Sequence, residues 1–307
     1  MGNLSRKNFF IATALLILST VCHGAAGNEI DLNEVETGSF AEPVDLSGAK
    51  AERIRVIAFN IRFGLKVDSV IEYLKTQVDF PGALVILLSE VDRHFSRTND
   101  ENLAAKMAGE LKMNYAYGVE FVELNDETPE TQGVTGNAIL SRLPISNTKV
   151  VRHSEQYEWG VRGGSRSALV ADIGLPDGKS IRVVSAHLEN RADNEGRAAQ
   201  MDEIIEAVKD SEIPVTIGGD LNETAGGPMF KRLAEAGFEN AFRKDSTTTC
   251  DCTHVANGKA MCFIKVDWIF YRGLGLKGRR VDDVVDSKGK LFSDHKPVRA
   301  DFEFENY

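Results

Sequence analysis

The distribution of apolar residues from residue 53 onward predicts a chain in which strands alternate with helices. Residues 53–60 alternate and then become apolar, as in a strand, and residues 83–90 form the nearly continuous apolar run typical of a strand buried on both faces. Between them, residues 67–78 carry apolar side chains at helical spacing. The same criteria predict helices at about 100–112, 195–209 and 228–236, and strands at 115–124, 136–141, 149–153, 166–173, 180–187, 214–219, 263–271, 276–285 and 298–304.

The chain after residue 50 is interpreted as one domain, because it contains no internal repeat, low-complexity tract or Pro/Ser-rich linker. We therefore expect a single domain over residues 51–307. Residues 27–50 are polar and acidic with little periodicity, which predicts a flexible lead-in.

Residues 1–26 have the layout of a secretory signal peptide. Arg6 and Lys7 precede the apolar run 9–21, and small residues follow at 24–26. The apolar core is short for a bilayer span, so we expect cleavage near Ala26, export to the periplasm or the extracellular space, and no membrane span afterwards. An uncleaved anchor is the alternative.

The composition is that of an ordinary globular protein, with 42% hydrophobic and 27% charged residues. Loss of Arg6 and Lys7 on cleavage, with no acidic residue removed, shifts the formal charge from −10 to −12. An acidic protein has no general electrostatic attraction to nucleic acid or to anionic membranes, so charge does not favour a nucleic-acid partner. We expect a monomer.

Three cysteines remain after cleavage, at Cys250, Cys252 and Cys262. In an oxidising compartment, we expect one disulfide to Cys262 across a short hairpin-like loop, leaving one thiol unpaired. Together with His254 these residues could also bind a structural zinc ion, although their spacing is not that of a standard zinc finger.

Candidate chemical groups fall at or near the ends of predicted strands. Asp220 and Asn222 follow the strand at 214–219 and, being two residues apart in an extended segment, would face the same side. Open α/β sheets bind ligands at the carboxyl ends of their strands. The full set is Asn60, Glu90, His187, Asp220, Asn222, Asp267, Asp294 and His295.

Seven motifs in order resemble those of the endonuclease/exonuclease/phosphatase superfamily. They are Ala-Phe-Asn60-Ile-Arg, Leu-Ser-Glu90-Val-Asp-Arg, Gly-Asn-Ala-Ile-Leu-Ser-Arg-Leu-Pro-Ile145, Ser-Ala-His187-Leu, Gly-Gly-Asp220-Leu-Asn222, Lys-Val-Asp267-Trp-Ile and Ser-Asp294-His295-Lys-Pro-Val. The resemblance covers about residues 50–305. It implies a four-layer α/β sandwich of two packed mixed β-sheets flanked by helices, as in deoxyribonuclease I. It also implies a divalent metal, Mg²⁺ or Mn²⁺, and hydrolysis of phosphate esters.

The resemblance assigns roles that match the needs of phosphate-ester hydrolysis: charge neutralisation, water activation and leaving-group stabilisation. Glu90 and Asn60 would hold the metal, and Asp294 would add a ligand or orient His295. Asp220 would accept the proton of the attacking water, while Asn222 bonds a phosphoryl oxygen. His187 and His295 would contact non-bridging oxygens, and some relatives treat these two histidines as the acid and the base. Asp267 would orient His295, and Glu120 is a carry-over candidate for orienting His187.

Several arginines follow the catalytic strands and are candidates to bind the substrate anion: Arg93, Arg162, Arg166 and Arg191. The alternative is that such arginines pair with loop acids, for example Asp92 or Asp193. The sequence therefore predicts a secreted, metal-dependent hydrolase of a small-molecule or lipid-headgroup phosphodiester or monoester. The alternatives are a secreted nuclease and a non-catalytic binding module on the same fold.

Overall fold

The computed structural model describes residues 30–43, 53–123, 133–155, 157, 160 and 162–304. The predicted signal peptide at residues 1–26 lies outside the described residues. Asp31–Tyr307 form one compact unit. Among the described residues, no helix combines the length and the apolar character that crossing a membrane would require.

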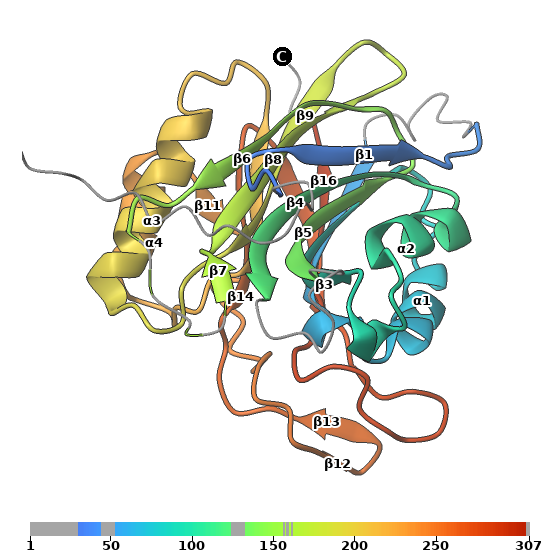
Figure 1. Cartoon of the computed structure of the whole chain (residues 1–307). Helices are drawn as coiled ribbons and strands as arrows, with labels where there is room; N and C mark the ends of the chain where they lie inside the picture. The colour runs from blue at the N-terminus through green and yellow to red at the C-terminus, as the bar shows by residue number, and fades with distance from the viewer. Residues whose placement is uncertain are drawn as a thin grey trace, which may run out of the picture. The chain divides into compact units, whose positions relative to one another are not determined.

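Two mixed β-sheets form the centre of this unit (Figure 1). In the first sheet the strands follow the order β1-β4-β5-β3-β2-β16-β15, and β7 also pairs with β4. Their bounds are β1 Val35–Ser39, β2 Arg53–Asn60, β3 Ala83–Arg93, β4 Asn114–Glu123, β5 Val134–Ser141, β7 Arg162–Gly164, β15 Gly275–Val281 and β16 Val298–Glu303. The second sheet has the order β11-β14-β10-β9-β8-β6, with β6 Ile145–Arg152, β8 Ser167–Gly174, β9 Ser180–His187, β10 Val215–Asp220, β11 Glu239–Asn240 and β14 Asp267–Arg272.

The two sheets pack face to face on a shared apolar core. At Gly218 in β10, an added Cβ would lie only 3.1 Å from Leu87 and 3.3 Å from Ala58, which belong to the first sheet. Helices α1 (Val67–Lys75) and α2 (Leu103–Leu111) lie on the first-sheet side, and α3 (Asn194–Val208) and α4 (Pro228–Glu235) lie on the second-sheet side (Figure 1). The prediction of a four-layer α/β sandwich is confirmed.

Short elements and connections complete the edge at which β2, β3, β9 and β10 end. The parallel pair β2/β3 places Asn60 beside Ser89, and the parallel pair β9/β10 places Asp220 beside His187. The 3₁₀ helices η2 (Arg62–Gly64) and η3 (Ser96–Thr98) follow β2 and β3. The hairpin formed by β12 (His254–Ala256) and β13 (Lys259–Met261) extends beyond the same edge (Figure 1).

The structure corrects the predicted flexible lead-in over residues 27–50, because Val35–Ser39 form the edge strand β1 paired antiparallel with β4. Glu36 fixes this strand by accepting hydrogen bonds from Asn102 and Tyr115, each at 2.6 Å, and by an ion pair with Arg93. The predicted strand at 263–271 begins only at Asp267, because Phe263 and Ile264 instead bond to the backbone of Cys250.

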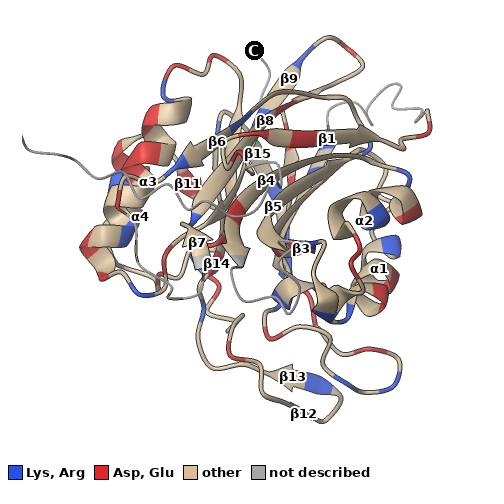
Figure 2. Cartoon of the chain, viewed as in Figure 1, with Lys and Arg blue, Asp and Glu red and all other residues tan. Residues whose placement is uncertain are grey.

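Acidic residues are conspicuous on α3 (Figure 2). They include Glu195, Asp202 and Glu206, while Arg232 of α4 pairs with the first two. These residues contribute to the acidic net charge of −10.

Candidate active site

Asp220 lies at the centre of the site because it ends β10 between two other catalytic strands. Its cross-strand neighbours are His187 in β9 and Asp267 in β14. The preceding residue, Gly219, has a φ of +148°, and a Cβ there would lie 1.9 Å from the carbonyl oxygen of Ala186. Only glycine permits this close approach, which places the Asp220 carboxylate beside the end of β9.

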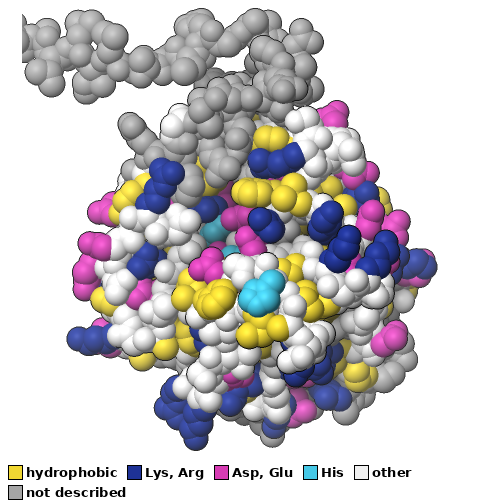
Figure 3. Space-filling view, turned by 90° about the horizontal axis from the view of Figure 1, so that it is seen from below, with side chains coloured by type: hydrophobic (Ala, Val, Ile, Leu, Met, Phe, Trp, Pro, Cys, Tyr) yellow, Lys and Arg dark blue, Asp and Glu magenta, His cyan; other side chains and the backbone are white. Residues whose placement is uncertain are grey.

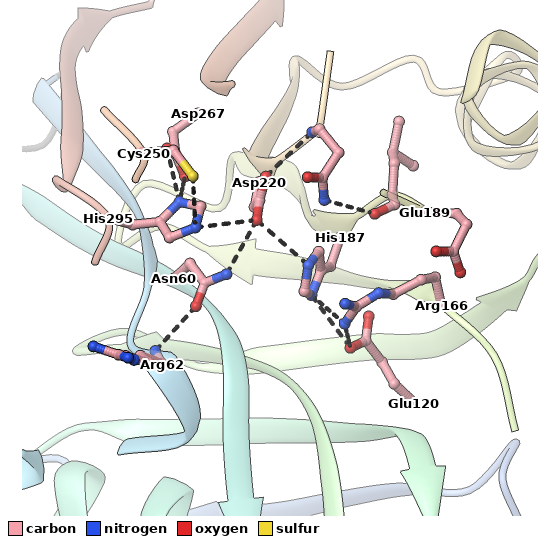
Figure 4. A network of polar contacts seen from close by, with 12 residues as sticks. Asn60, Arg62, Glu120, Arg166, His187, Glu189, Asp220, Cys250, Asp267 and His295 are labelled. Atoms are coloured by element: carbon pink, nitrogen blue, oxygen red, sulfur yellow. Dashed lines mark hydrogen bonds and ion pairs between the residues drawn. The ribbon is translucent and has the colours of Figure 1, made fainter. Parts of the chain in front are cut away.

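Donors surround the Asp220 carboxylate (Figure 4). Oδ2 accepts a hydrogen bond from Asn60 Nδ2 at 3.1 Å and lies 3.4 Å from His187 Nε2 and 3.7 Å from His295 Nε2. Oδ1 accepts from the backbone N–H of Asn222 at 3.1 Å. Burial alone would raise the pKa of Asp220, but the two histidines and Asn60 outweigh it and lower this pKa. Asp220 therefore remains ionised.

His295 is held between two carboxylates. Its Nδ1 lies 3.0 and 3.2 Å from the two carboxylate oxygens of Asp267, and its Nε2 faces Asp220. Burial lowers the pKa of His295, but Asp267 and Asp220 raise it well above its ordinary value. Burial also raises the pKa of Asp267, so a proton is retained within the Asp267–His295 pair in the neutral range. The structure gives Asp267 the geometry expected of a residue that orients His295.

His187 contacts a buried ionic group formed by Glu120 and Arg166. Its Nδ1 lies 3.3 Å from Glu120 Oε2 and 2.9 Å from Arg166 Nη1, and Arg166 Nη1 also donates to Glu120 at 3.2 Å. Burial and Arg166 would lower the pKa of His187, but Glu120 and Asp220 outweigh them and raise it to about 9. His187 is therefore protonated at neutral pH, and Nδ1–H donates to Glu120 rather than accepting from Arg166. Asn137 completes the group by donating to Glu120 at 3.0 Å.

Glu90 occupies a distorted position at the end of the regular part of β3. The register between β3 and β5 shifts between Leu88 and Val91, and Glu90 has a φ of +55°. Such a bulge redirects a side chain away from the strand alternation. In the portion of the chain that the structure describes, no hydrogen bond or ion pair engages the half-buried Glu90 carboxylate. An uncommitted carboxylate beside the end of β2 fits a cation ligand.

The oxygen donors near Glu90 suit a hard divalent cation. Asn60 is 1% exposed, and its Oδ1 accepts from the backbone N–H of Arg62 at 3.0 Å. Asp294 is partly exposed and lies 3.4 Å from Arg62 Nε. Carboxylate and amide oxygens of this kind are the ligands that Mg²⁺ prefers.

A second group, Asp220, Asp267 and His295, presents ligand atoms that all lie within 4.8 Å of one another. In this group Asp267 and His295 Nδ1 are already hydrogen-bonded to each other. We therefore regard Glu90 and its neighbours as the better place for a hard cation.

The four arginines predicted to bind substrate have different environments. The guanidinium of Arg93 pairs with Glu36 and lies 5.1 Å from the ring of Tyr117, so it anchors β1, and a contact with substrate stays a prediction. Arg166 is 5% exposed and braces His187 from within the protein. Arg191 is exposed, and its backbone N–H donates to Glu189 at 2.9 Å. The side chain of Arg162 lies outside the described part of the chain.

Asn222 lies close to Asp220 and is held by hydrogen bonds to neighbouring segments. Its φ is +49°, its backbone N–H donates to Asp220, and its Nδ2 donates to Leu188 O at 2.9 Å. These bonds tie the loop after β10 to the end of β9. A contact between Asn222 and a phosphoryl oxygen stays a prediction.

Two residues of the site were not identified from the sequence. Arg62 is half-exposed beside Asn60 and Asp294, and its position two residues after Asn60 was the available signal. Cys250 Sγ lies 3.2 Å from His295 Nε2, across 45 residues of sequence, and nothing in the local pattern indicated this contact. Burial raises the pKa of the Cys250 thiol. The expected disulfide is confirmed as Cys252–Cys262, and Cys250 is the unpaired thiol.

The edge of the sandwich that carries these groups is hollowed. Figure 3 shows histidine and acidic side chains recessed near the centre of this face, with apolar and cationic side chains around them. A recess of this composition can accept a phosphate group whose charge is balanced by a cation and two imidazolium groups.

Comparisons with known proteins agree with this geometry. The model of the endonuclease/exonuclease/phosphatase family matches residues 57–295. No curated protein matches the chain. A solved endonuclease/exonuclease/phosphatase from Beutenbergia cavernae DSM 12333 is 19% identical, with a TM-score of 0.63 over 83% of this chain and 72% of that chain.

Two further solved structures carry more specific names. The mannosyl-6-phosphatase of Bacteroides thetaiotaomicron VPI-5482 is 15% identical, with a TM-score of 0.58 over 82% of this chain and 100% of that chain. The human Nocturnin catalytic domain is also 15% identical, with a TM-score of 0.54 over 89% of this chain and 97% of that chain. At these identities the likeness shows the fold alone.

Proposed function

The chain belongs to the endonuclease/exonuclease/phosphatase family, and on this premise we propose that it is a metal-dependent phosphoesterase acting on a small-molecule or lipid-headgroup phosphate ester. The observation that carries the proposal is the convergence of Asn60, His187 and His295 on one oxygen of Asp220. This arrangement keeps a carboxylate ionised next to two cationic imidazoles, as hydrolysis of an anionic ester requires.

We assign the metal to Glu90, with Asn60 and Asp294 as neighbouring oxygen donors. A divalent cation, Mg²⁺ or Mn²⁺, would supply Lewis-acid neutralisation of the charge on the phosphoryl oxygens. The uncommitted Glu90 carboxylate supports this assignment.

The side chains of the chain itself divide the remaining work. Asp220 orients the attacking water and accepts its proton as the bond to phosphorus forms. The P–O bond to the esterified group breaks at the same time, and the leaving oxygen takes up a proton and departs as the alcohol. His187 and His295 stabilise the negative charge that develops on the non-bridging oxygens. Asp267 positions His295, and Glu120 and Arg166 position His187, so neither imidazole must reorganise during the reaction.

An exposed apolar segment beside the site favours a substrate with an apolar organic part. Met261, Phe263 and Ile264 are 42%, 62% and 39% exposed. Phe263 N–H donates to the carbonyl of Cys250 at 3.0 Å, and the side chain of Cys250 touches His295. The segment is therefore linked to His295 through a single residue, Cys250. At this position it can contact the group esterified to the phosphate.

Export and a monomeric state complete the proposal, supported by the signal-peptide pattern at residues 1–26 and the acidic charge of −10. The same charge makes nucleic acid the second-choice substrate.

The proposal is tested by hydrolysis assays on the purified protein with Mg²⁺ and with chelator. Bis-(p-nitrophenyl) phosphate, inositol phosphates, sphingomyelin and plasmid DNA are offered side by side, with Asp220→Ala as the inactive control. We expect chelator-sensitive release from the aryl or lipid ester, lost in the variant. Cleavage of DNA alone, weakening steeply with salt, would establish the nuclease instead.

A matched variant tests the apolar segment. Phe263→Ala should raise KM for the aryl and lipid esters and leave KM for inositol phosphates unchanged. Only the aryl and lipid esters have an apolar part that would lose its contact with the Phe263 side chain. Equal changes for both substrates would contradict a role in recognition.

A further inference from the structure

The thiol of Cys250 faces the catalytic histidine. Its Sγ lies 3.2 Å from His295 Nε2, while the other two described cysteines, Cys252 and Cys262, are joined in a disulfide. The backbone of Cys250 is fixed on both sides, since its N–H donates to Ile264 O at 2.9 Å and its carbonyl accepts from Phe263 N–H. The thiol is therefore held against the imidazole and is free of any disulfide.

His295 is oriented as a metal-binding histidine is. Asp267 engages Nδ1 at 3.0 Å, which leaves Nε2 as the nitrogen that is presented to other groups. Histidine ligands in proteins commonly donate their second ring N–H to a carboxylate in this way. Asp220 Oδ2 lies 3.7 Å from the same Nε2, so a carboxylate oxygen stands beside the nitrogen that Cys250 contacts.

We propose that Cys250 Sγ and His295 Nε2, with Asp220 as the third ligand, form a binding site for a thiophilic divalent cation such as Zn²⁺, and that its occupancy inhibits hydrolysis. The inhibitory effect rests on the function proposed above, whereas the binding does not.

Two separations agree with this assignment, from sulfur to nitrogen and from nitrogen to oxygen. Tetrahedral zinc with bonds of about 2.3 Å to sulfur and 2.0–2.2 Å to nitrogen and oxygen separates sulfur from nitrogen by about 3.5 Å and nitrogen from oxygen by about 3.4 Å. The observed separations of 3.2 and 3.7 Å each differ from these by a few tenths of an ångström. Binding displaces the thiol proton and the proton on Nε2.

The ligand types separate this site from the one at Glu90. Thiolate and imidazole select zinc-like cations, whereas the carboxylate and amide oxygens around Glu90 select Mg²⁺. A cation at Cys250 would remove both His295 and Asp220 from the reaction without displacing the metal at Glu90. Inhibition should therefore not be relieved by adding Mg²⁺.

Binding is tested on the metal-free purified protein without thiol reductants. Cd²⁺ should produce a thiolate charge-transfer absorption in the wild type that is lost in Cys250→Ser and Cys250→Ala. Zn²⁺ affinity, measured by calorimetry, should fall at least about 10- to 100-fold in both variants. The matched control is His254→Ala. This exposed histidine lies on the adjacent hairpin and its side chain contacts Thr253, so the zinc affinity of the variant should equal that of the wild type. No thiolate band in the wild type, or unchanged zinc affinity in both Cys250 variants, would overturn the proposal.

Inhibition is tested by titrating Zn²⁺ at a fixed saturating Mg²⁺ concentration. The Zn²⁺ concentration that halves each protein's own rate should be at least tenfold higher in Cys250→Ser than in the wild type and in His254→Ala. Equal sensitivity of all three would overturn the inhibitory role. If the wild type hydrolyses no ester, the proposed function fails, and the calorimetric and spectroscopic results still decide the metal site.

Discussion

Replacing Glu120 by glutamine is expected to remove a pH-dependent stabilisation of the fold that comes from His187. Glu120 is fully buried and lies 3.3 Å from His187 Nδ1. Against the effects of burial and Arg166, Glu120 and Asp220 raise the pKa of His187 from 6.5 to about 9. Because the folded-state pKa is the higher one, the stabilisation is fully present below pH 6.5 and is lost as pH rises through about 9.

The size of the effect follows from the two pKa values. A difference between 6.5 and about 9 corresponds to about 3 kcal/mol in the free energy of unfolding. With glutamine at this position, only Asp220 still opposes the effects of burial and Arg166, so the pKa of His187 falls. At pH 7, we expect Glu120→Gln to be destabilised by about 3–5 kcal/mol, since a buried pair has lost one partner. This deficit should shrink as pH rises through 9, by at most about 3 kcal/mol, because Asp220 contributes part of the shift in both proteins.

The assay is urea unfolding of the protein in the presence of a metal chelator, at pH values from about 6 to 10. Asp172→Asn is the matched control. Asp172 is 5% exposed and pairs at 2.7 Å with Arg182, which lies on the same strand as His187. Arginine does not titrate in this pH range. The deficit of Asp172→Asn should therefore be constant with pH. A deficit in Glu120→Gln that is also constant with pH would refute the assignment of the charged His187 to Glu120.

Three further predictions concern the catalytic carboxylates and the disulfide. Asp220→Asn should lower kcat at least about 100-fold in the hydrolysis assay, because the proton acceptor is lost. Thermal unfolding should remain cooperative, because the hydrogen bonds are largely retained. Wild-type turnover would contradict this role of Asp220. Glu90→Gln should raise the Mg²⁺ concentration for half-maximal activity at least about tenfold in a metal titration, and an unchanged requirement would place the metal elsewhere. The double replacement Cys252→Ser with Cys262→Ser should lower the free energy of unfolding by about 2–4 kcal/mol in urea, whereas no change would show that the loop is held without its cross-link.

The central strands and helices could be predicted from the sequence because their apolar patterns involve only neighbouring residues. The apolar run at 83–90 became β3, buried on both faces, and the helical spacing at 67–78 became α1 (Val67–Lys75). The meeting of His187 and Asp220 also followed from the sequence, since both residues end parallel strands whose carboxyl ends share one edge of the sheet.

The parts that were missed depend on contacts between distant residues. The edge strand β1 has the polar sequence Val-Glu-Thr-Gly-Ser and is stabilised by pairing with β4 rather than by its own pattern. The pairing of Arg93 with Glu36 was missed because the two residues lie 57 positions apart in sequence. The contact of Cys250 with His295 is hidden for the same reason.

The pairing of β1 with β4 determines how far the chain can be shortened from its N-terminal side. A chain starting at residue 51, where the sequence placed the domain boundary, would lack Glu36. It would leave one edge of Asn114–Gly118 of β4 unpaired, while the other edge stays paired with β5. An uncovered strand edge is a template for pairing between molecules. Truncation at that boundary should therefore yield a protein that self-associates, although the catalytic residues would all be present, and the practical starting point for recombinant work lies before Val35.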